Sequence, residues 1–194
     1  MTDQPKVLLI GDSISLGYGP HVERELRGRF RVAHHEGNCG DSANLLAHLS
    51  EWLAVDADAA AVHFNVGLHD LKRPRDGSGL QVPPESYERN MERIVSGLKA
   101  TGKCLIWATI TPVIYERHLI KQFDRRQEDV QAYNAAALRV IEAAGIPVDD
   151  LHAFVVGAGV EKLIGEDGVH FNEEGYRLLG EQVCRAINRH AGSA

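Results

Sequence analysis

The chain has 194 residues, of which 44% are hydrophobic, and a formal net charge of −6 at pH 7. This length and apolar content suit one well-packed domain over 1–194 and are too small to argue for two. Lys and Arg are scattered among Asp and Glu, which argues against a nucleic-acid partner and a polybasic membrane anchor. No apolar run approaches the roughly 20 residues of a membrane span.

The cysteines and the first residues favour a cytoplasmic location. Cys39, Cys104 and Cys184 are widely separated and lack the spacing of zinc or redox motifs, which predicts reduced, mostly buried thiols. Residues 1–5 are polar and carry no basic segment, long apolar run or cleavage site typical of a signal peptide. We therefore expect a soluble cytoplasmic protein, unless a leader precedes this sequence.

Apolar runs of strand length alternate along the chain with segments of helical periodicity. Strands are predicted at 6–10, 31–35, 59–66, 103–110 and 146–148. Helices are predicted at 20–29, from Asp41-Ser42 to 53, from Pro83-Pro84 to about 100, at 130–144 and at 173–190. This alternation predicts an α/β fold with a five-stranded parallel sheet, helices on both faces, and functional loops at the carboxyl ends of the strands.

Two irregular stretches, 72–82 and 111–124, leave the carboxyl ends of predicted strands and can line or cover a pocket. Basic residues gather in and after the second stretch: Arg117, His118, Lys121, Arg125 and Arg126. This group is either solvated or contacts a carboxylate, phosphate or sugar hydroxyl at a pocket rim. Tyr115 and Phe123 either stack on a sugar ring or anchor the loop, and the sequence leaves both readings open.

Ser13, Asp167 and His170 supply the parts of a hydrolytic triad. Ser13 follows the first predicted strand, so its hydroxyl is expected at the carboxyl edge of the sheet, where it needs a base to take its proton. His170 precedes the last predicted helix and can return over the same edge, and Asp167 is spaced for a local contact with one ring nitrogen. A serine in such a loop alone is more often a turn or cap residue, but the Asp-His block favours catalysis.

Four blocks resemble, in order and spacing, those of the GDSL-type esterases of the SGNH hydrolase superfamily. The blocks are Gly11-Asp12-Ser13-Ile14, Asn38-Cys39-Gly40-Asp41-Ser42, Gly67-Leu68-His69-Asp70 and Asp167-Gly168-Val169-His170. The resemblance implies a flavodoxin-like three-layer αβα sandwich and ester hydrolysis without a metal or other cofactor. It also implies Ser13 as nucleophile, Asp167 and His170 as acid and base, and the backbone N–H groups of Ser13 and Gly40 as oxyanion donors.

The third block departs from the family pattern, because His69 stands where the family usually has an Asn that serves as a third oxyanion donor. A neutral imidazole still offers one N–H, so we expect His69 to be a donor. If it became charged near the unperturbed pKa of about 6.5, it would stabilise an oxyanion better and disfavour a nearby His170 imidazolium. Asn65, on the preceding strand, could supply an amide instead.

Other polar residues near the blocks fit structural duties. Asp12 is expected to bond backbone amides of its own loop and is not the predicted triad acid. Gly40 suits a left-handed turn, which is compatible with a donor role, and Asn65 is favoured as a buried amide that fixes loop backbone. Seven further histidines lack metal-site spacing and are expected to be solvated or singly bonded: His34, His35, His48, His63, His118, His152 and His190.

The sequence predicts a metal-independent serine esterase that removes a short acyl group, with acetyl as first candidate, from an oxygen ester of a small molecule or carbohydrate. The polar loops and the lack of a long apolar lid argue against a lipase that acts at an interface. Lysophospholipase and thioesterase activities stay open, as does an SGNH-like binding module weakened by His69. A nucleotide or flavin binder is disfavoured, because the first loop lacks a phosphate-cradling Gly-rich sequence with Lys.

Overall fold

A computed structural model describes residues 4–118 and 122–192. Its central sheet has five parallel strands in the spatial order β2-β1-β3-β5-β7. The strands are β1 (Lys6–Ile10), β2 (Arg31–His34), β3 (Ala59–Phe64), β5 (Cys104–Ala108) and β7 (Val148–Asp149). Counted within the sheet alone, this is the flavodoxin-like order 2-1-3-4-5, so the predicted fold class is confirmed.

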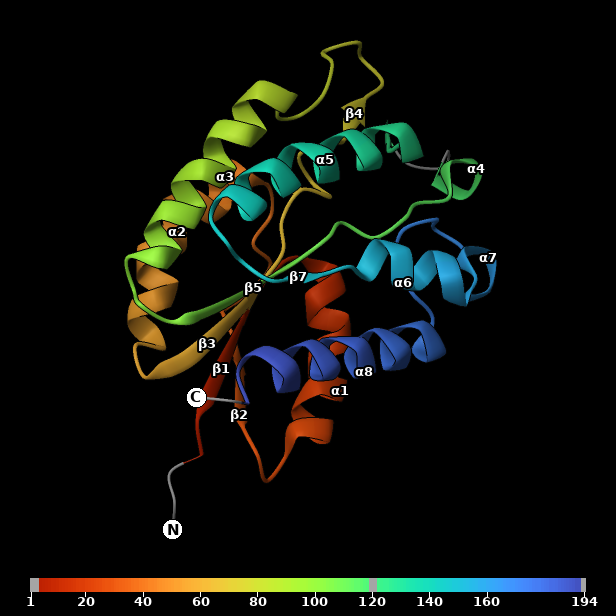
Figure 1. Cartoon of the computed structure of the whole chain (residues 1–194). Helices are drawn as coiled ribbons and strands as arrows, with labels where there is room; N and C mark the ends of the chain where they lie inside the picture. The colour runs from red at the N-terminus through yellow and green to blue at the C-terminus, as the bar shows by residue number, and fades with distance from the viewer. Residues whose placement is uncertain (1–3, 119–121, 193–194) are drawn as a thin grey trace.

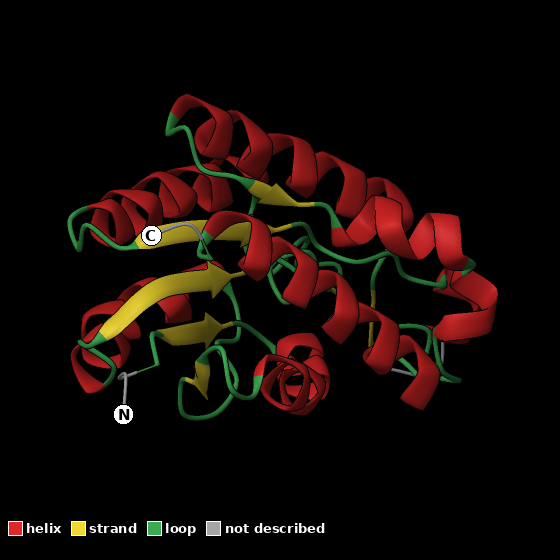
Figure 2. Ribbon diagram, turned by 60° about the horizontal axis from the view of Figure 1, so that its bottom comes forward, coloured by secondary structure: helices red, strands yellow, loops and turns green. Residues whose placement is uncertain are grey.

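Helices cover both faces of the sheet (Figures 1 and 2). One layer contains α1 (Ser13–Leu26) and α8 (Glu173–His190), which pack against each other. The other contains α2 (Ser42–Val55), α3 (Pro84–Lys99) and α5 (Gln127–Ala143). Because neither face of the sheet is left to solvent, β1 is apolar after its first residue, and Val7, Leu8, Leu9 and Ile10 are buried.

Two glycines let α1 and α8 approach closely. A Cβ at Gly17 would lie 2.1 Å from a ring carbon of Tyr176, and one at Gly180 would lie 2.6 Å from the Cβ of His21. Side chains at these positions would therefore push the helices apart. The close packing matters for the site, because α1 begins at Ser13 and the turn that carries His170 leads into α8.

The first helix differs from its prediction, since it begins at Ser13 instead of residue 20. Pro20, which suggested a helix start, lies inside α1 with its ring exposed. The true start is set by Asp12, whose side chain accepts a hydrogen bond from the Ile14 N–H at 2.9 Å. Ser13 is therefore the first helical residue instead of part of an open loop.

The other predicted elements are present with shifted ends. Strands β3 and β5 end two residues before their predicted limits, at Phe64 and Ala108, and α5 begins at Gln127. Three short helices are not predicted by the sequence, because they are too short for a clear helical period: α4 (Tyr115–His118), α6 (Leu151–Ala158) and α7 (Val160–Leu163).

The two irregular stretches are joined to each other, which the sequence did not indicate. Strand β4 (Arg73–Pro74) in the first pairs antiparallel with β6 (Phe123–Asp124) in the second. A two-residue strand has no periodicity to detect, so only tertiary structure could reveal this pairing. The pairing holds the two loops together beside the carboxyl edge of the sheet.

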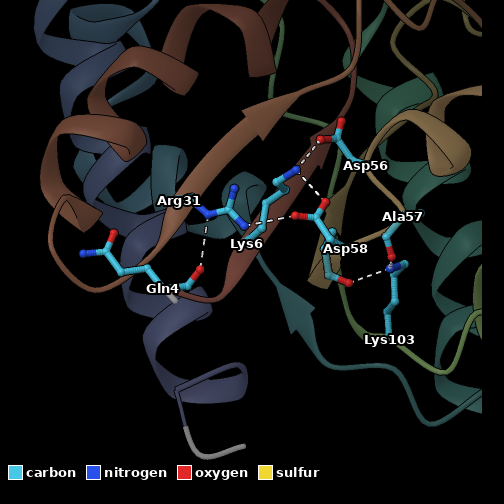
Figure 3. Close-up of polar contacts among 8 residues, drawn as sticks. Gln4, Lys6, Arg31, Asp56, Ala57, Asp58 and Lys103 are labelled. Carbon is cyan, nitrogen blue, oxygen red and sulfur yellow. Dashed lines mark hydrogen bonds and ion pairs between the residues drawn. The ribbon is translucent and has the colours of Figure 1, made fainter. Parts of the chain in front are cut away.

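The amino-terminal edge of the sheet is closed by paired charges (Figure 3). Lys6 Nζ lies 3.1 Å from Asp56 Oδ1 and 2.5 Å from Asp58 Oδ1. Arg31 Nη2 lies 3.0 Å from Asp58 Oδ2, and Lys103 Nζ donates to the Ala57 carbonyl at 2.7 Å. This cluster links β1, β2 and β5 to the turn before β3.

Two general predictions can be compared with the described residues. The cysteines are unpaired, with Cys39 and Cys184 buried and Cys104 partly so. Within 4–118 and 122–192, no helix is both long and apolar enough to cross a membrane.

Candidate active site

Ser13, Asp167 and His170 lie together at the carboxyl edge of the sheet. Ser13 Oγ is 2.8 Å from His170 Nε2, and His170 Nδ1 is 2.6 Å from Asp167 Oδ2. Both contacts are satisfied when the Ser13 hydroxyl donates to Nε2 and the Nδ1–H donates to the carboxylate. Ser13 is half-buried and His170 is exposed, so the hydroxyl can be reached from solvent.

The Asp167 carboxylate is held by its own turn. Its Oδ1 accepts hydrogen bonds from the N–H groups of Val169 and His170, at 3.0 and 2.9 Å. Partial burial raises the pKa of Asp167, but hydrogen bonds from the His170 side chain and these two N–H groups outweigh it and lower the pKa to about 2. The carboxylate is therefore ionised and able to stabilise a charged imidazole beside it.

The turn that carries His170 is fixed from several sides. Gly165 N–H donates to the His170 carbonyl at 2.7 Å, and Ile114 N–H donates to the Gly168 carbonyl at 2.8 Å. Gly168 has a φ of 75°, a left-handed conformation that favours glycine. Asn172 then caps α8 by accepting from the Gly175 N–H at 2.9 Å. These contacts fix the backbone from which the His170 ring reaches Ser13.

Gly40 lies in the loop after β2 with a φ of 66°, as its predicted left-handed turn requires. The Cys39 N–H donates to the Gly11 carbonyl at 3.0 Å, which ties this loop to the one that carries Ser13. The Gly40 N–H donates to Oδ1 of the exposed Asn38 at 2.8 Å, a contact that the sequence analysis did not anticipate. An oxyanion at Gly40 would have to displace the Asn38 side chain or share the Gly40 N–H with it.

A buried carboxylate connects the loops of the second and third blocks. Both oxygens of Asp70 accept from the Ser42 N–H, at 3.1 and 2.9 Å, and the Ser42 hydroxyl also donates to Asp70. Asn90 Nδ2 donates to the same hydroxyl at 2.9 Å. Burial raises the pKa of Asp70 to about 7, against the hydrogen bonds from Ser42. Sequence reasoning missed this link, because Ser42 reads as a helix start and Asp70 as a turn residue.

His69 is half-buried in the turn after β3, and its Nδ1 lies 3.0 Å from Lys72 Nζ. Burial, together with the charges of Lys72 and Arg125, lowers the pKa of His69 to about 4. The ring is therefore neutral near pH 7. The alternative in which His69 becomes charged near 6.5 does not apply in this environment.

Asp12 and Asn65 lie beneath the loop that carries Ser13. Asp12 is fully buried and accepts from the Ile14 N–H, as expected of a residue that holds its own loop. Asn65 is also buried, and a Cβ at Gly11 would lie 2.1 Å from Asn65 Oδ1. Burial raises the pKa of Asp12, which hydrogen bonds from the Ile14 N–H and the Asn65 side chain partly offset. This packing explains why only glycine fits before the Asp-Ser pair.

The described basic residues after β5 do not form one solvated group, because each has its own contacts. Arg125 is 5% exposed, its Nε donates to the Leu68 carbonyl at 2.6 Å, and its guanidinium lies 5.1 Å from the centre of the Phe123 ring. Arg117 donates to the Ile164 carbonyl at 2.7 Å and pairs with a glutamate. Arg126 lies 5.8 Å from the Tyr115 ring centre. Lys121 and the His118 side chain lie outside the described residues.

Of the histidines outside the blocks, His63 is fully buried, with Nε2 3.1 Å from Asp149 Oδ2. Across residues 4–118 and 122–192, no group of three or more His, Cys, Asp or Glu side chains is placed to hold a metal ion. A metal-free reaction stays a prediction, which a chelator tests directly.

Residues 9–178 match the GDSL-like Lipase/Acylhydrolase family. The chain belongs to this family. GDSL-like acylhydrolases are hydrolytic esterases, so the protein is a carboxylic ester hydrolase whose substrate is a small-molecule ester. No curated protein matches the chain.

Solved structures share the fold of this GDSL-like chain at low identity. A lipase/acylhydrolase from Enterococcus faecalis has 22% identity and a TM-score of 0.81, with 96% of each chain covered. An acetyl xylan esterase, AlAXEase, has 16% identity and a TM-score of 0.77, with 94% of this chain and 99% of that chain covered. The structure of TesA has 20% identity and a TM-score of 0.72, with 95% and 98% covered. These likenesses support the fold and do not assign a substrate.

Proposed function

We propose that this GDSL-like hydrolase is a serine esterase that removes short acyl groups, acetyl first, from oxygen esters through an acyl-Ser13 intermediate. The observation that carries the proposal is the continuous set of contacts from the Ser13 hydroxyl through His170 to Asp167, at 2.8 and 2.6 Å. A hydroxyl hydrogen-bonded to an imidazole, itself oriented by a carboxylate, is the arrangement that activates serine.

In the proposed reaction, His170 Nε2 takes the Ser13 proton as Oγ attacks the ester carbonyl carbon. The resulting imidazolium is stabilised by Asp167 and returns the proton to the leaving alcohol as the bond between carbon and alcohol oxygen breaks. Water then attacks the acyl-Ser13 ester, again losing its proton to His170, and the carboxylic acid leaves as Ser13 recovers its proton.

The oxyanion of each tetrahedral intermediate needs hydrogen-bond donors, and the loss of one donor costs about 3 to 4 kcal/mol of transition-state stabilisation. We assign this role to the N–H groups of Ser13 and Gly40 and to the His69 ring. Ser13 is the first residue of α1, where N–H groups have no partner inside the helix. At Gly40 the developing charge would replace the Asn38 side chain as acceptor, and a charged acceptor is the stronger partner.

Polar side chains beside the two joined loops support a hydrophilic substrate, with an acetylated carbohydrate as one candidate. A cavity of about 410 Å³ between these loops is lined in part by Arg73, Arg75, Tyr115 and Arg126, of which Arg73 pairs with Asp129 and Arg126 with Asp124. Guanidinium groups and a phenol ring suit sugar hydroxyls and rings better than long acyl chains. One structural relative is named as an acetyl xylan esterase, which agrees with this choice.

A second candidate is an SGNH-like protein that binds ligands with weakened catalysis. Two features favour it: His69 stands in place of the usual Asn donor, and the Gly40 N–H already donates a hydrogen bond to Asn38. Lysophospholipase and thioesterase activities are further outcomes of the same test.

The test is hydrolysis of p-nitrophenyl esters from acetate to decanoate, with the parent protein, the Ser13→Ala variant and an added chelator. We expect activity that is highest on acetate, survives chelation and falls by about 10⁴-fold in Ser13→Ala, whose melting temperature should match that of the parent. Highest activity on long chains would favour a lysophospholipase or thioesterase. Residual activity of more than a few per cent in Ser13→Ala would mean another nucleophile, and no activity on any ester would favour the binding module.

A further inference from the structure

The partner of His69 determines which of its ring nitrogens carries the proton. Lys72 Nζ lies 3.0 Å from His69 Nδ1. An ammonium group has three N–H donors and no acceptor, so Nδ1 must accept this hydrogen bond. A neutral imidazole has only one N–H, which therefore stands on Nε2. No hydrogen bond occupies His69 Nε2 within the part of the chain that the structure describes.

The backbone between the two residues is a tight turn that puts both side chains on one side. Leu71 N–H donates to the Gly67 carbonyl at 3.2 Å, and Lys72 N–H donates to the His69 carbonyl at 3.3 Å. The Lys72 carbonyl in turn accepts from the Gln81 N–H at 2.8 Å. Spacing by three residues in a helical turn brings side chains together, so the contact follows from a held backbone.

The ammonium group is also held from the opposite loop. Lys72 Nζ lies 5.1 Å from the centre of the Phe123 ring, and the Arg125 guanidinium lies at the same distance from that ring. Arg125 Nε donates to the Leu68 carbonyl, directly before His69. The β4-β6 pairing therefore brings a cation-binding ring against the turn that carries His69.

We propose that Lys72 is a positioning residue that fixes His69 as the neutral Nε2–H form, so that the ring presents a donor and not a lone pair to the oxyanion. The inference rests on the proposed function, because it assigns His69 its place beside the Ser13 and Gly40 donors. In the other neutral form, Nδ1 would carry the proton and Nε2 would direct a lone pair at the oxyanion, which is repulsive. Lys72 excludes that form.

Burial and the cations near His69 together disfavour a charged ring. Burial comes first, and the cations Lys72 and Arg125, with a further contribution from His170, disfavour a charged ring, while Asp41 alone favours it. The pKa of His69 is lowered to about 4 as a result. The donor is thus a neutral imidazole near pH 7.

Groups of both charge signs lie near Lys72 and shift its pKa in opposite directions. Burial and the neighbouring Arg125 lower the pKa of Lys72, and Asp41, Asp70 and Asp12 partly oppose this. These carboxylates favour an ammonium group at the centre of the turn. The net shift of the Lys72 pKa is downward, so these carboxylates limit the effect of burial and do not reverse it.

The kinetic test compares Lys72→Met in two backgrounds, with His69 and with His69→Asn. In the His69 background, we expect kcat on p-nitrophenyl acetate to fall on the order of 10-fold, less than the 10²-fold or more for loss of a whole donor. KM should hardly change, and the acid limb of the pH profile should move, because His69 can now protonate at a higher pH. In the His69→Asn background, Lys72→Met should change kcat less than about 2-fold, since the amide needs no lysine to set its donor.

Two variants serve as controls. Lys72→Arg keeps a cation with N–H donors and should retain more activity than Lys72→Met. Lys99→Met removes an exposed lysine that donates to the Ala144 carbonyl at the far end of α3, and it should leave kcat and the pH profile unchanged. Equal losses from Lys72→Met in both backgrounds would overturn the inference, because Lys72 would then act on substrate or on the fold.

Ring-nitrogen NMR of ¹⁵N-histidine protein tests the inference without turnover, with the His69 signals assigned by their loss in His69→Asn. We expect an unprotonated Nδ1 and a protonated Nε2 in the parent at pH 7, and a changed Nδ1 shift in Lys72→Met. A protonated Nδ1 in the parent would overturn the inference even if Ser13-dependent esterase activity were found. If no such activity were found, the proposed function would fail while the NMR result still decided which nitrogen carries the proton.

Discussion

The two edges of the parallel sheet differ in where their charged side chains lie and in what those side chains bind. At the amino-terminal edge, Lys6, Arg31 and Asp58 pair at or near the surface (Figure 3). At the carboxyl edge, Asp12 and Asp70 are fully buried and hold backbone and hydroxyl groups of the loops. A surface ion pair contributes little free energy and its loss is tolerated, whereas a buried carboxylate is costly unless its hydrogen bonds are made. The buried carboxyl groups thus lie at the edge where the loops carry the candidate catalytic residues.

The strands are common to both edges, so the difference arises from the loops. At the carboxyl edge, the chain passes directly from β1 into α1 and from the β2 loop into α2, so that Asp12 and Asp41 act as helix caps. Helix N-termini present unpaired N–H groups, which suit negative charge and developing oxyanions. Helices α1 and α2 end toward the amino-terminal edge, where a helix presents carbonyl groups and not N–H groups.

Asp167→Asn at the carboxyl edge is expected to have the largest effect of the substitutions that compare the two edges. It should lower kcat about 10³ to 10⁴-fold, because an amide can neither stabilise the His170 imidazolium nor hold the ring in the required form. The melting temperature should stay near that of the parent, since the side chain is partly exposed. Steady-state rates on p-nitrophenyl acetate and a thermal melt check this, and a loss below 10-fold would mean that another group orients His170.

Asp70→Asn should change how stability depends on pH. The pKa of Asp70 is raised to about 7 by burial, compared with about 3.9 for an ordinary aspartate. Between these pH values the folded protein binds a proton that the unfolded chain has released, so Asp70 makes the free energy of unfolding fall as pH rises from about 4 to 7. The variant lacks this proton, so the stability of the parent minus that of the variant should decline over that window and then level off.

Urea unfolding of both proteins from pH 4.5 to 8 measures this difference. Asp58→Asn at the other edge is the matched control, because the hydrogen bond from Lys6 lowers the pKa of Asp58. Its contribution to stability is fully present above the unfolded pKa of about 3.9 and is lost only as pH falls below it, so the parent-minus-variant difference for Asp58→Asn should stay flat from pH 4.5 to 8. A flat difference for Asp70→Asn, or an equal decline for Asp58→Asn over this range, would contradict the contrast between the edges.

Lys6→Met should have the smallest effect. Hydrogen bonds with Asp58 and Asp56 raise the pKa of Lys6, and the hydrogen bond from Lys6 lowers the pKa of Asp58. The pair therefore stabilises the fold over a pH window. The window ends in acid, where Asp58 takes up a proton, and in alkali, where Lys6 loses one. We expect a melting temperature at most a few degrees lower at pH 7, a smaller difference in high salt, and kcat/KM within about twofold of the parent. A large loss of activity would show that this edge influences the site.

Much of the candidate site can be predicted from single residues and their order. Ser13, Asp167 and His170 stand out because few residue types can act as nucleophile, acid and base, and each follows a recognisable element. The links between blocks could not be predicted in this way. Ser42 and Asp70 look like ordinary cap and turn residues, and nothing in their local sequence shows that they meet.

The boundaries of the elements show the same division. The long helix from Pro84 to Lys99 and the last helix are predicted well, because their apolar faces have a clear period over four or more turns. The first helix begins at Ser13 and not at residue 20 as predicted, because Asp12, expected only to bond its own loop, caps the helix. The β4 and β6 strands have two residues each and exist only because two distant loops meet.

The sequence by itself determined the α/β class, the family and the residue types of the candidate chemistry, because alternating apolar periods and ordered motifs are local properties of the chain. Tertiary structure alone decided that His170 lies 2.8 Å from Ser13, that Asn38 occupies the Gly40 N–H, and that Lys72 selects the ring nitrogen of His69 that carries a proton. The first contact joins residues 157 positions apart and arises only when distant segments pack together. The other two are local, but their geometry depends on turns whose backbone and burial are set by the loops packed around them.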